Sequence, residues 1–391
     1  MKRNLWLLAI AQGLFLTNNV VFIAINGLVG LKLAPVSWMA TLPVMGYVVG
    51  GALSTGLVAR TQQRWGRKRS FQLGLLNAFA TTLLCALALS IGSFPLLLCG
   101  TVLAGYYSAN GQLYRFAAAE LVPASMREKA VSLVLAGGLI GAILGPNLAN
   151  QTREVMSLPF LASYLALAVV AVLAWLIISA IDFPAEQAPA AAGTAAGGRP
   201  LSEIMRQPIF IVATLAAALS YGVMNLLMAA TPLAMDVCGL PFSDAALVLQ
   251  WHVIGMFAPG FVTGHLIKRF GVLPIMGWGV VLNLACVAVA LSGQDLHQFL
   301  IALFLLGVGW NFLFTGSTTL ALESYRSEEK DRAQAAINFA VFATMAFTSF
   351  ASGALVTTQG WTLLNLGSLP ALLFTGGALW WLHLRRRTEV R

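Results

Sequence analysis

Charged residues are scarce in this chain of 391 residues: Asp, Glu, Lys and Arg together make up 9% of it, and hydrophobic residues make up 59%. A soluble domain carries roughly 25% charged residues, so a water-exposed surface is excluded for most of the chain. The mean hydropathy of +0.82 agrees with this. The sequence therefore predicts that lipid surrounds most of the folded protein.

Cysteine and histidine are also rare, with four of each. The cysteines are Cys85, Cys99, Cys238 and Cys286, and the histidines are His252, His265, His297 and His383. The cysteines lack the paired spacing of a zinc site or a disulfide framework, so we interpret them as small packing residues. No His-Cys-Asp cluster at ligand spacing is present either. The sequence predicts no metal, no cofactor, no catalytic residue and no enzyme.

What the chain has in abundance is long apolar runs, each about 20 residues and thus long enough to cross a bilayer. The predicted spans are 5–27, 37–59, 70–91, 94–114, 130–150, 158–181, 208–231, 243–267, 272–292, 297–320, 333–357 and 361–384. We interpret the first as a retained membrane helix rather than a cleaved signal peptide, because the run is too long and lacks a cleavage-like end. The fold class predicted is an all-α integral membrane protein with twelve transmembrane helices.

An Ala-, Gly- and Pro-rich segment interrupts the runs after the sixth span. Its low complexity offers no packing face and is typical of a flexible linker; a regulatory docking segment is the alternative. The predicted domains are an N-terminal six-helix bundle at 1–181, a linker at 182–207 and a C-terminal six-helix bundle at 208–391.

The basic residues orient these helices. Of the 23 Lys and Arg residues, only Lys32 and Arg153 fall in the odd-numbered connections. Lys and Arg gather on the cytoplasmic side, so both termini and the linker are expected there, in the inner membrane of a bacterium. The net charge of +9 does not indicate nucleic-acid binding, because the cations lie at helix ends; anionic membrane lipids are their expected partner.

The connection between the second and third spans, residues 60–69, has five cations among ten residues. It resembles the signature loop of the major facilitator superfamily, which reads Gly, three residues, Asp, Arg, any, Gly, Arg, and Lys or Arg. Arg64, Gly66, Arg67 and Lys68 match, whereas Gln63 replaces the Asp. Ala59 replaces the first Gly.

A weaker copy of this loop follows 205 positions later, where Gly264, Arg269 and Gly271 match and Lys268 replaces the acid. Two further connections repeat at the same distance: Glu120 is followed by Arg127 in the first half and Glu323 by Arg332 in the second, and the two arginines are also 205 apart. A repeat of sequence motifs at about half the chain length is typical of a transporter that arose by internal duplication. Two further strings, 114–118 and 307–314, resemble a bacterial group of uncharacterised permeases.

The resemblance implies two pseudo-symmetric bundles that rock about a central cavity lined by the first helix of each three-helix repeat. Mid-membrane polar side chains on those helices are costly to leave in lipid, and amides and aromatic rings suit a planar, hydrogen-bonding ligand. The substrate-binding residues implied are Asn18, Asn19, Asn110, Tyr114, Arg115, Tyr221, Asn225, Trp310 and Asn311. The gating and coupling residues implied are Arg64, Arg67, Glu120, Arg127, His252, Arg269, Glu323 and Arg332.

Several of these residues have an alternative role. Each Asn can instead make an interhelical hydrogen bond. Arg115 can anchor the inner end of its helix by bonding Glu120, or contact an anionic substrate. His252 can carry protons or be a hydrogen-bonded packing residue. The glycines of 137–145, four apart, favour close helix packing and partly resemble a motif of antiporters.

No acidic residue lies deep in a predicted span, which disfavours an exporter of cations. The sequence therefore predicts a secondary transporter, expected to be a monomer, that moves a small polar or anionic organic solute, with a planar vitamin-like molecule as one candidate. The alternative is a proton-driven drug or metabolite exporter, and protons are a candidate coupling ion. A membrane enzyme or a non-transporting receptor is a third class, although no metal cluster or nucleophile with its base supports an enzyme.

Overall fold

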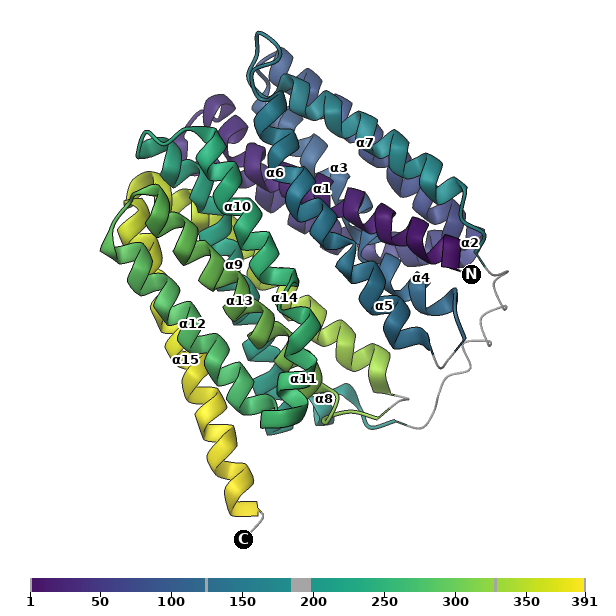
Figure 1. Cartoon of the computed structure of the whole chain (residues 1–391), viewed down its shortest axis with the longest axis vertical. Coiled ribbons are helices and arrows are strands. Elements are labelled where there is room, and N and C mark those ends of the chain that lie inside the picture. The colour runs from purple at the N-terminus through teal and green to yellow at the C-terminus, as the bar shows by residue number, and fades with distance from the viewer. Residues whose placement is uncertain (1, 124–125, 184–197, 327–328, 390–391) are drawn as a thin grey trace.

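The computed structural model describes residues 2–123, 126–183, 198–326 and 329–389, and over these residues the chain is helical without a strand (Figure 1). The helices are α1 Lys2–Leu33, the 3-10 helix η1 Ser37–Met39, α2 Leu42–Ser90, α3 Phe94–Gly111, α4 Tyr114–Glu120, α5 Arg127–Ala136, α6 Gly138–Thr152, α7 Leu161–Ser179, α8 Leu201–Ile204, α9 Pro208–Val237, α10 Phe242–Phe257, α11 Gly260–Phe270, α12 Val272–Ser292, α13 Leu296–Ala321, α14 Lys330–Thr358 and α15 Gly360–Glu389.

Nine of the described helices are long and apolar enough to cross a membrane, and the pair α10 and α11, bent by 41°, adds a tenth span. The count rises to twelve because α2 contains two spans, and because α3 continues into α4 as one further broken span. The helices α5 and α6 together form one span, Leu133–Thr152, which is already among the nine. Counted so, the described helices form the twelve transmembrane helices that the sequence predicts.

The basic connection at 60–69 does not interrupt the helical pattern as expected; it is helical on both sides of a single break at Gly66. Gly66 has φ 78° and ψ 168°, and Gly271, 205 residues later, has φ 90° and ψ 159° between α11 and α12. This backbone region is essentially restricted to glycine. The sequence duplication is therefore repeated in the backbone itself.

The helices form two bundles, α1 to α7 and α9 to α15, which Figure 1 shows as the purple-to-blue and the green-to-yellow groups. The bundles contact each other through α1 with α9, α6 with α10, and α2 with α14. We call the end that carries residues 60–69, 121–123 and 322–326 the inner end, and the end that carries η1 and residues 153–160 and 238–241 the outer end.

Glycines bring α1 and α6 into backbone contact, as their four-residue spacing predicts. A Cβ atom at Gly141 would lie 2.6 Å from Leu16 Cβ and 2.7 Å from the Gly13 carbonyl oxygen. A Cβ atom at Gly13 would in turn lie 2.8 Å from the Gly137 carbonyl oxygen. The glycines thus fix the position of α1, the helix that carries Asn18 and Asn19.

Candidate functional site

An aromatic cluster lies on the C-terminal bundle where α9, α10 and α13 meet. Tyr221 contacts Trp310 edge to face, with ring centroids 5.2 Å apart, and Phe314 stacks on Trp310 at 5.0 Å. Phe257 approaches Trp310 from α10 at 6.4 Å. The spacing of four residues between Trp310 and Phe314 puts both rings on one face of α13. Trp310 is buried, yet its indole Nε1 has no hydrogen-bond partner among the described residues.

Arg115 faces this cluster from the N-terminal bundle. It lies in the first turn of α4, and its charge is near enough to Tyr221 of α9 to act on that side chain. Its guanidinium lies 4.9 Å from the ring centroid of Phe116. The Nε atom of Arg115 is buried and lacks a hydrogen-bond partner within the described part of the chain. A cation of the N-terminal bundle thus lies near Tyr221, one member of the aromatic cluster of the C-terminal bundle.

Glu120, the partner that the sequence offered for Arg115, bonds another arginine. Arg67 donates from Nε to one Glu120 carboxylate oxygen at 2.6 Å and from Nη2 to the other. Reading Arg115 as an anchor bonded to Glu120 is therefore wrong in this structure, because the fold turns the carboxylate towards residue 67. Arg115 as a substrate contact stays a prediction.

The asparagines of the C-terminal bundle are bonded within that bundle. Asn225 donates to the Ser349 hydroxyl at 2.7 Å and to the Thr348 hydroxyl at 3.1 Å. Asn311 donates to the Met256 carbonyl oxygen at 2.7 Å and accepts from Thr263 at 2.6 Å. The structure therefore does not direct these two amides towards Arg115, and their contact with a substrate stays a prediction.

The polar residues of the N-terminal bundle form a second group. Asn18 is buried and Asn19 half-buried on α1, and Asn18 flanks the Tyr47 hydroxyl, which has no hydrogen-bond partner in the described residues. Asn110 is fully buried and bonded to Ser70. Tyr114 packs edge to face on Phe71 at 4.9 Å, and its hydroxyl also lacks a described partner.

Apart from His252, the predicted gating residues lie at the inner end, and no ion pair or hydrogen bond of their described side chains joins the two bundles. Glu323 accepts from Arg386 of α15 at 2.5 Å, rather than from an arginine of a neighbouring connection. Arg64 and Arg269 lie over the adjacent Trp65 and Phe270 rings. Two arginines remain. Arg332 is exposed in α14, and Arg127 begins α5 with its side chain outside the described part.

His252 is buried between α10 and α13. Its Nδ1 lies 2.7 Å from the Leu303 carbonyl oxygen, so Nδ1 carries the proton and donates it. Its Nε2 has no partner among the described residues. The geometry supports a neutral packing residue, and a role in carrying protons stays a prediction.

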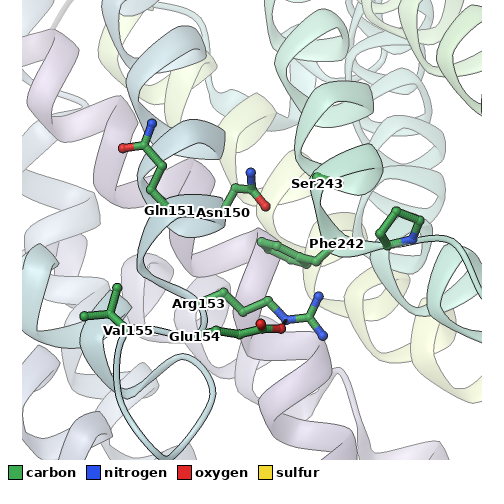
Figure 2. Close-up of a pocket in the computed structure, with 8 residues that line it drawn as sticks. Asn150, Gln151, Arg153, Glu154, Val155, Phe242 and Ser243 are labelled. Atoms are coloured by element: carbon green, nitrogen blue, oxygen red, sulfur yellow. Dashed lines mark ion pairs between the residues drawn. The ribbon is translucent and has the colours of Figure 1, made fainter.

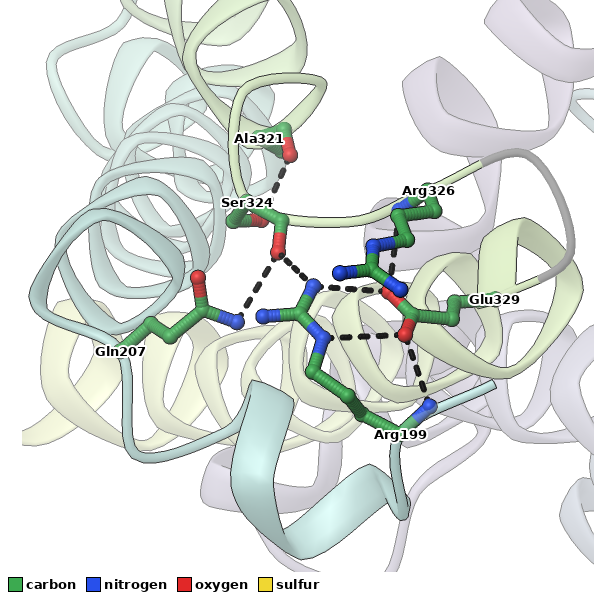
Figure 3. A network of polar contacts seen from close by, with 6 residues as sticks. All are labelled: Arg199, Gln207, Ala321, Ser324, Arg326 and Glu329. Atoms are coloured by element: carbon green, nitrogen blue, oxygen red, sulfur yellow. Dashed lines mark hydrogen bonds and ion pairs between the residues drawn. The ribbon is translucent and has the colours of Figure 1, made fainter. Parts of the chain in front are cut away.

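Sequence reasoning missed the most extensive polar network of the inner end, which centres on Glu329 (Figure 3). Arg199 donates to this carboxylate from Nε at 3.0 Å, from Nη2 at 2.8 Å and from its backbone N–H at 2.8 Å, and the Arg326 N–H adds a bond of 2.9 Å. The hydrogen bonds from the Arg199 side chain hold the pKa of the Glu329 carboxyl far below its ordinary value.

The same network fixes the chain that enters the C-terminal bundle. The Ser324 carbonyl oxygen accepts from Arg199 at 3.1 Å and from Gln207 at 2.9 Å. The segment from residue 198 to α9 is thereby tied to the connection before α14. The only signal in the sequence was the acidic string that contains both Glu323 and Glu329, and spacing alone did not show which acid is buried.

Hydrogen bonds join the two bundles in the outer half of the protein. All hydrogen bonds that link the two bundles among the described residues lie there. The Thr41 hydroxyl donates to the Ser349 carbonyl oxygen at 2.6 Å and accepts from the Gly353 N–H at 3.0 Å. Asn147 donates to the Gln250 side chain at 2.8 Å. The outer end is therefore closed.

A pocket of 440 Å³ lies at the outer end of this seam, between the end of α6 and the connection from α9 to α10 (Figure 2). The pocket is lined by Asn150, Gln151, Arg153, Glu154, Val155, Pro241, Phe242 and Ser243. It lies far along the bundles from Arg115 and the aromatic cluster, so it is separate from the candidate substrate site.

The chain is similar to known membrane transporters. The family model described as Major Facilitator Superfamily matches residues 5–260 and 213–391. The riboflavin transporter RfnT of Brucella anthropi is 38% identical over 366 residues, covering 93% of this chain and 92% of that protein. The uncharacterised transporter YddS of Bacillus subtilis is 25% identical, covering 90% of this chain and 84% of that protein.

Solved structures share the fold. A bacterial homologue of the lysosomal transporter Spinster, in an inward-facing and occupied conformation, has a TM-score of 0.73 at 15% identity, over 96% of this chain and 95% of that chain. A D-xylose–proton symporter has a TM-score of 0.70 at 14% identity, over 95% of this chain and 96% of that chain.

Proposed function

The chain belongs to the major facilitator superfamily and is a transporter of a small solute, and from this premise we propose that it carries riboflavin or a closely similar planar, acceptor-rich molecule. The transporter RfnT, whose name gives riboflavin as its substrate, is similar to this chain over nearly the whole length of both proteins. The sequence alone favoured a planar, hydrogen-bonding solute. The physical case for a flavin comes from the residues between the bundles.

The observation that carries the proposal is a pair of unpartnered donors, one in the aromatic cluster and one on the facing helix α4. Trp310 Nε1 and Arg115 Nε are both buried without a hydrogen-bond partner in the described residues. A buried donor left unpaired costs about 1–3 kcal/mol, so a ligand that brings acceptors is favoured there. Riboflavin combines a flat three-ring system, which can stack on aromatic side chains, with two ring carbonyls that can accept from these donors.

A ligand held in this way would touch both bundles, because Arg115 belongs to α4 and Trp310 to α13. Binding energy could then favour closing the inner end over the substrate, which is what alternating access requires. The closed outer half supports an inward-facing state for this structure. Solute would enter or leave the site from the inner end in this state.

The membrane arrangement is part of the proposal. We infer that the inner end faces the cytoplasm of a bacterium, with both termini there, because arginines concentrate at that end. The domains at 1–181 and 208–391, with a linker between them, remain part of the proposal, and the bond between Arg199 and Glu329 ties the end of that linker to the start of α14. We also propose that the basic residues of the inner end contact anionic membrane lipids, and that the protein is a monomer.

Flavin fluorescence offers a direct binding test, because stacking on an aromatic side chain quenches it. Purified protein titrated with riboflavin should show saturable quenching. Trp310→Ala should weaken binding about tenfold through the lost ring contact, and Trp310→Phe less, because it keeps a ring but loses the N–H donor. The matched control is Trp278→Ala, since Trp278 is exposed on α12. Equal affinities of Trp310→Ala and Trp278→Ala would refute the site.

The cation is tested in the same assay. Arg115→Gln should weaken riboflavin binding about tenfold, because a charged donor to an acceptor contributes about 1.5–3 kcal/mol. The exposed Arg60, changed to Gln, serves as the control for the lost charge. No saturable quenching with the unmodified protein would remove riboflavin as the substrate while leaving the transporter fold untouched.

A further inference from the structure

Arg153 is one of the two cations that the charge pattern puts on the outer side, and neither the substrate site nor the inner-end pairs involve it. It follows directly after α6 and lines the outer pocket (Figure 2). Its guanidinium lies 5.6 Å from the ring centroid of Phe160 and 5.4 Å from that of Phe242. One cation therefore contacts two aromatic rings.

The two rings belong to different bundles. Phe160 precedes α7 of the N-terminal bundle, and Phe242 is the first residue of α10 in the C-terminal bundle. Their centroids are 5.2 Å apart with an interplanar angle of 71°, an edge-to-face pair. Both rings are buried, with exposed fractions of 7% and 5%. The three side chains thus form a continuous contact across the outer seam.

The backbone at Phe160 is held in a costly conformation. Phe160 has φ 69°, and it is the one non-glycine residue with positive φ in the described part of the chain. Its N–H donates to the Arg153 carbonyl oxygen at 2.8 Å, which closes the loop that Arg153 begins. A bulky residue persists in this region only where its surroundings enforce it, and such residues concentrate at functional sites. The loop therefore delivers the Phe160 ring to Arg153 and Phe242.

We propose that Arg153, Phe160 and Phe242 form a cation–aromatic latch that holds the outer end closed, so that opening outwards requires Phe242 to leave the other two. The proposal rests on alternating access, but it does not depend on which solute is carried. Glu154 cannot replace the latch, because it is on the same bundle as Arg153, at 3.5 Å, and is largely exposed.

Such a latch differs from an ion-pair gate in a measurable way. Attraction between a guanidinium and buried aromatic rings involves no second charge, and salt screens buried contacts less than exposed ones. Lysine keeps the charge of arginine but lacks its flat face, which can stack on a ring. Leucine keeps the apolar bulk of phenylalanine but lacks the ring. Arg153→Lys and Phe242→Leu therefore weaken the latch while changing charge and volume little.

Outward opening can be followed through a buried thiol on the seam. Val253 of α10 packs with Leu16, Val20 and Ala142 of the other bundle and is 3% exposed. In a protein with Cys99, Cys238 and Cys286 replaced, the labelling rate of Val253→Cys measures how often the bundles separate, however rare that is. Cys85, buried within α2, reports general unfolding in a parallel protein without the Val253 change.

Arg153→Lys and Phe242→Leu should each raise the labelling rate of the Val253→Cys thiol about tenfold, and the double variant should raise it no further than the larger single effect. Glu154→Gln should leave it unchanged, and so should raising NaCl from low to high concentration. Labelling of Cys85 should not change in any variant. Rates within twofold of the parent in both single variants, or fully additive effects in the double variant, would overturn the latch. No substrate is present, so failed riboflavin binding leaves this result unaffected.

Discussion

Replacing Gly141 with Ala tests how closely α1 must lie against α6. The added Cβ would meet Leu16 Cβ at 2.6 Å, and both the Gly13 carbonyl oxygen and the Thr17 nitrogen at 2.7 Å. Contacts between heavy atoms are favourable from about 3.5 Å, so α1 has to move by roughly 0.8 Å. Two of the three atoms belong to the backbone and cannot rotate away. We expect a loss of about 1–3 kcal/mol in stability.

Thermal unfolding of the purified protein measures this loss. Gly141→Ala should lower Tm by a few degrees. Gly56→Ala is the matched control: it makes the same change in α2, where an added Cβ would have no atom within 4 Å. There the better helix propensity of Ala should leave Tm unchanged or raise it. If Gly141→Ala proved as stable as Gly56→Ala, the close contact of α1 with α6 would not exist.

Three further predictions concern the inner end and the orientation. Glu329→Gln should lower Tm at pH 7, whereas the exposed Glu203→Gln should not. Because the pKa of Glu329 is lowered in the folded state, the stability that its carboxylate contributes is present above the unfolded pKa of about 4.3 and fades as the pH falls below that value. The Tm values of parent and variant should therefore converge in acid, and a difference in Tm that stays constant with pH would contradict this. His252→Gln should leave the pH dependence of solute uptake unchanged, since its Nδ1 serves the Leu303 carbonyl, and a lost pH dependence would make His252 a proton carrier. A topology reporter fused after Arg391 should be active in the cytoplasm, and activity confined to the periplasm would reverse the proposed orientation.

Much of the fold could be predicted from hydropathy and repetition. About 20 apolar residues are needed to cross a bilayer, so each span is visible without knowledge of its neighbours. The duplication could be predicted as well, because a glycine-only backbone conformation requires glycine at both Gly66 and Gly271. The helix continuing on either side of Gly66 was not predicted, since a cluster of cations at 60–69 is typical of a loop.

Side-chain partners were harder to predict, because spacing along the chain does not give the rotation of one helix against another. Glu120 is near Arg115 in sequence, yet the fold brings Arg67 to it. Asn225 was expected at a central space, and its donors are used by α14. The outer contact of Arg153 needs residues from two bundles and a left-handed Phe160, and no pattern in the sequence signals that conformation.

Riboflavin exchange in proteoliposomes tests the central claim most directly. Vesicles preloaded with unlabelled riboflavin should accumulate labelled riboflavin from outside only when they contain the protein, and excess unlabelled riboflavin outside should compete. Trp310→Ala and Arg115→Gln should slow this exchange about tenfold, whereas Trp278→Ala should not. Exchange no faster than in protein-free vesicles, or equal exchange in all three variants, would contradict a flavin site between the two bundles.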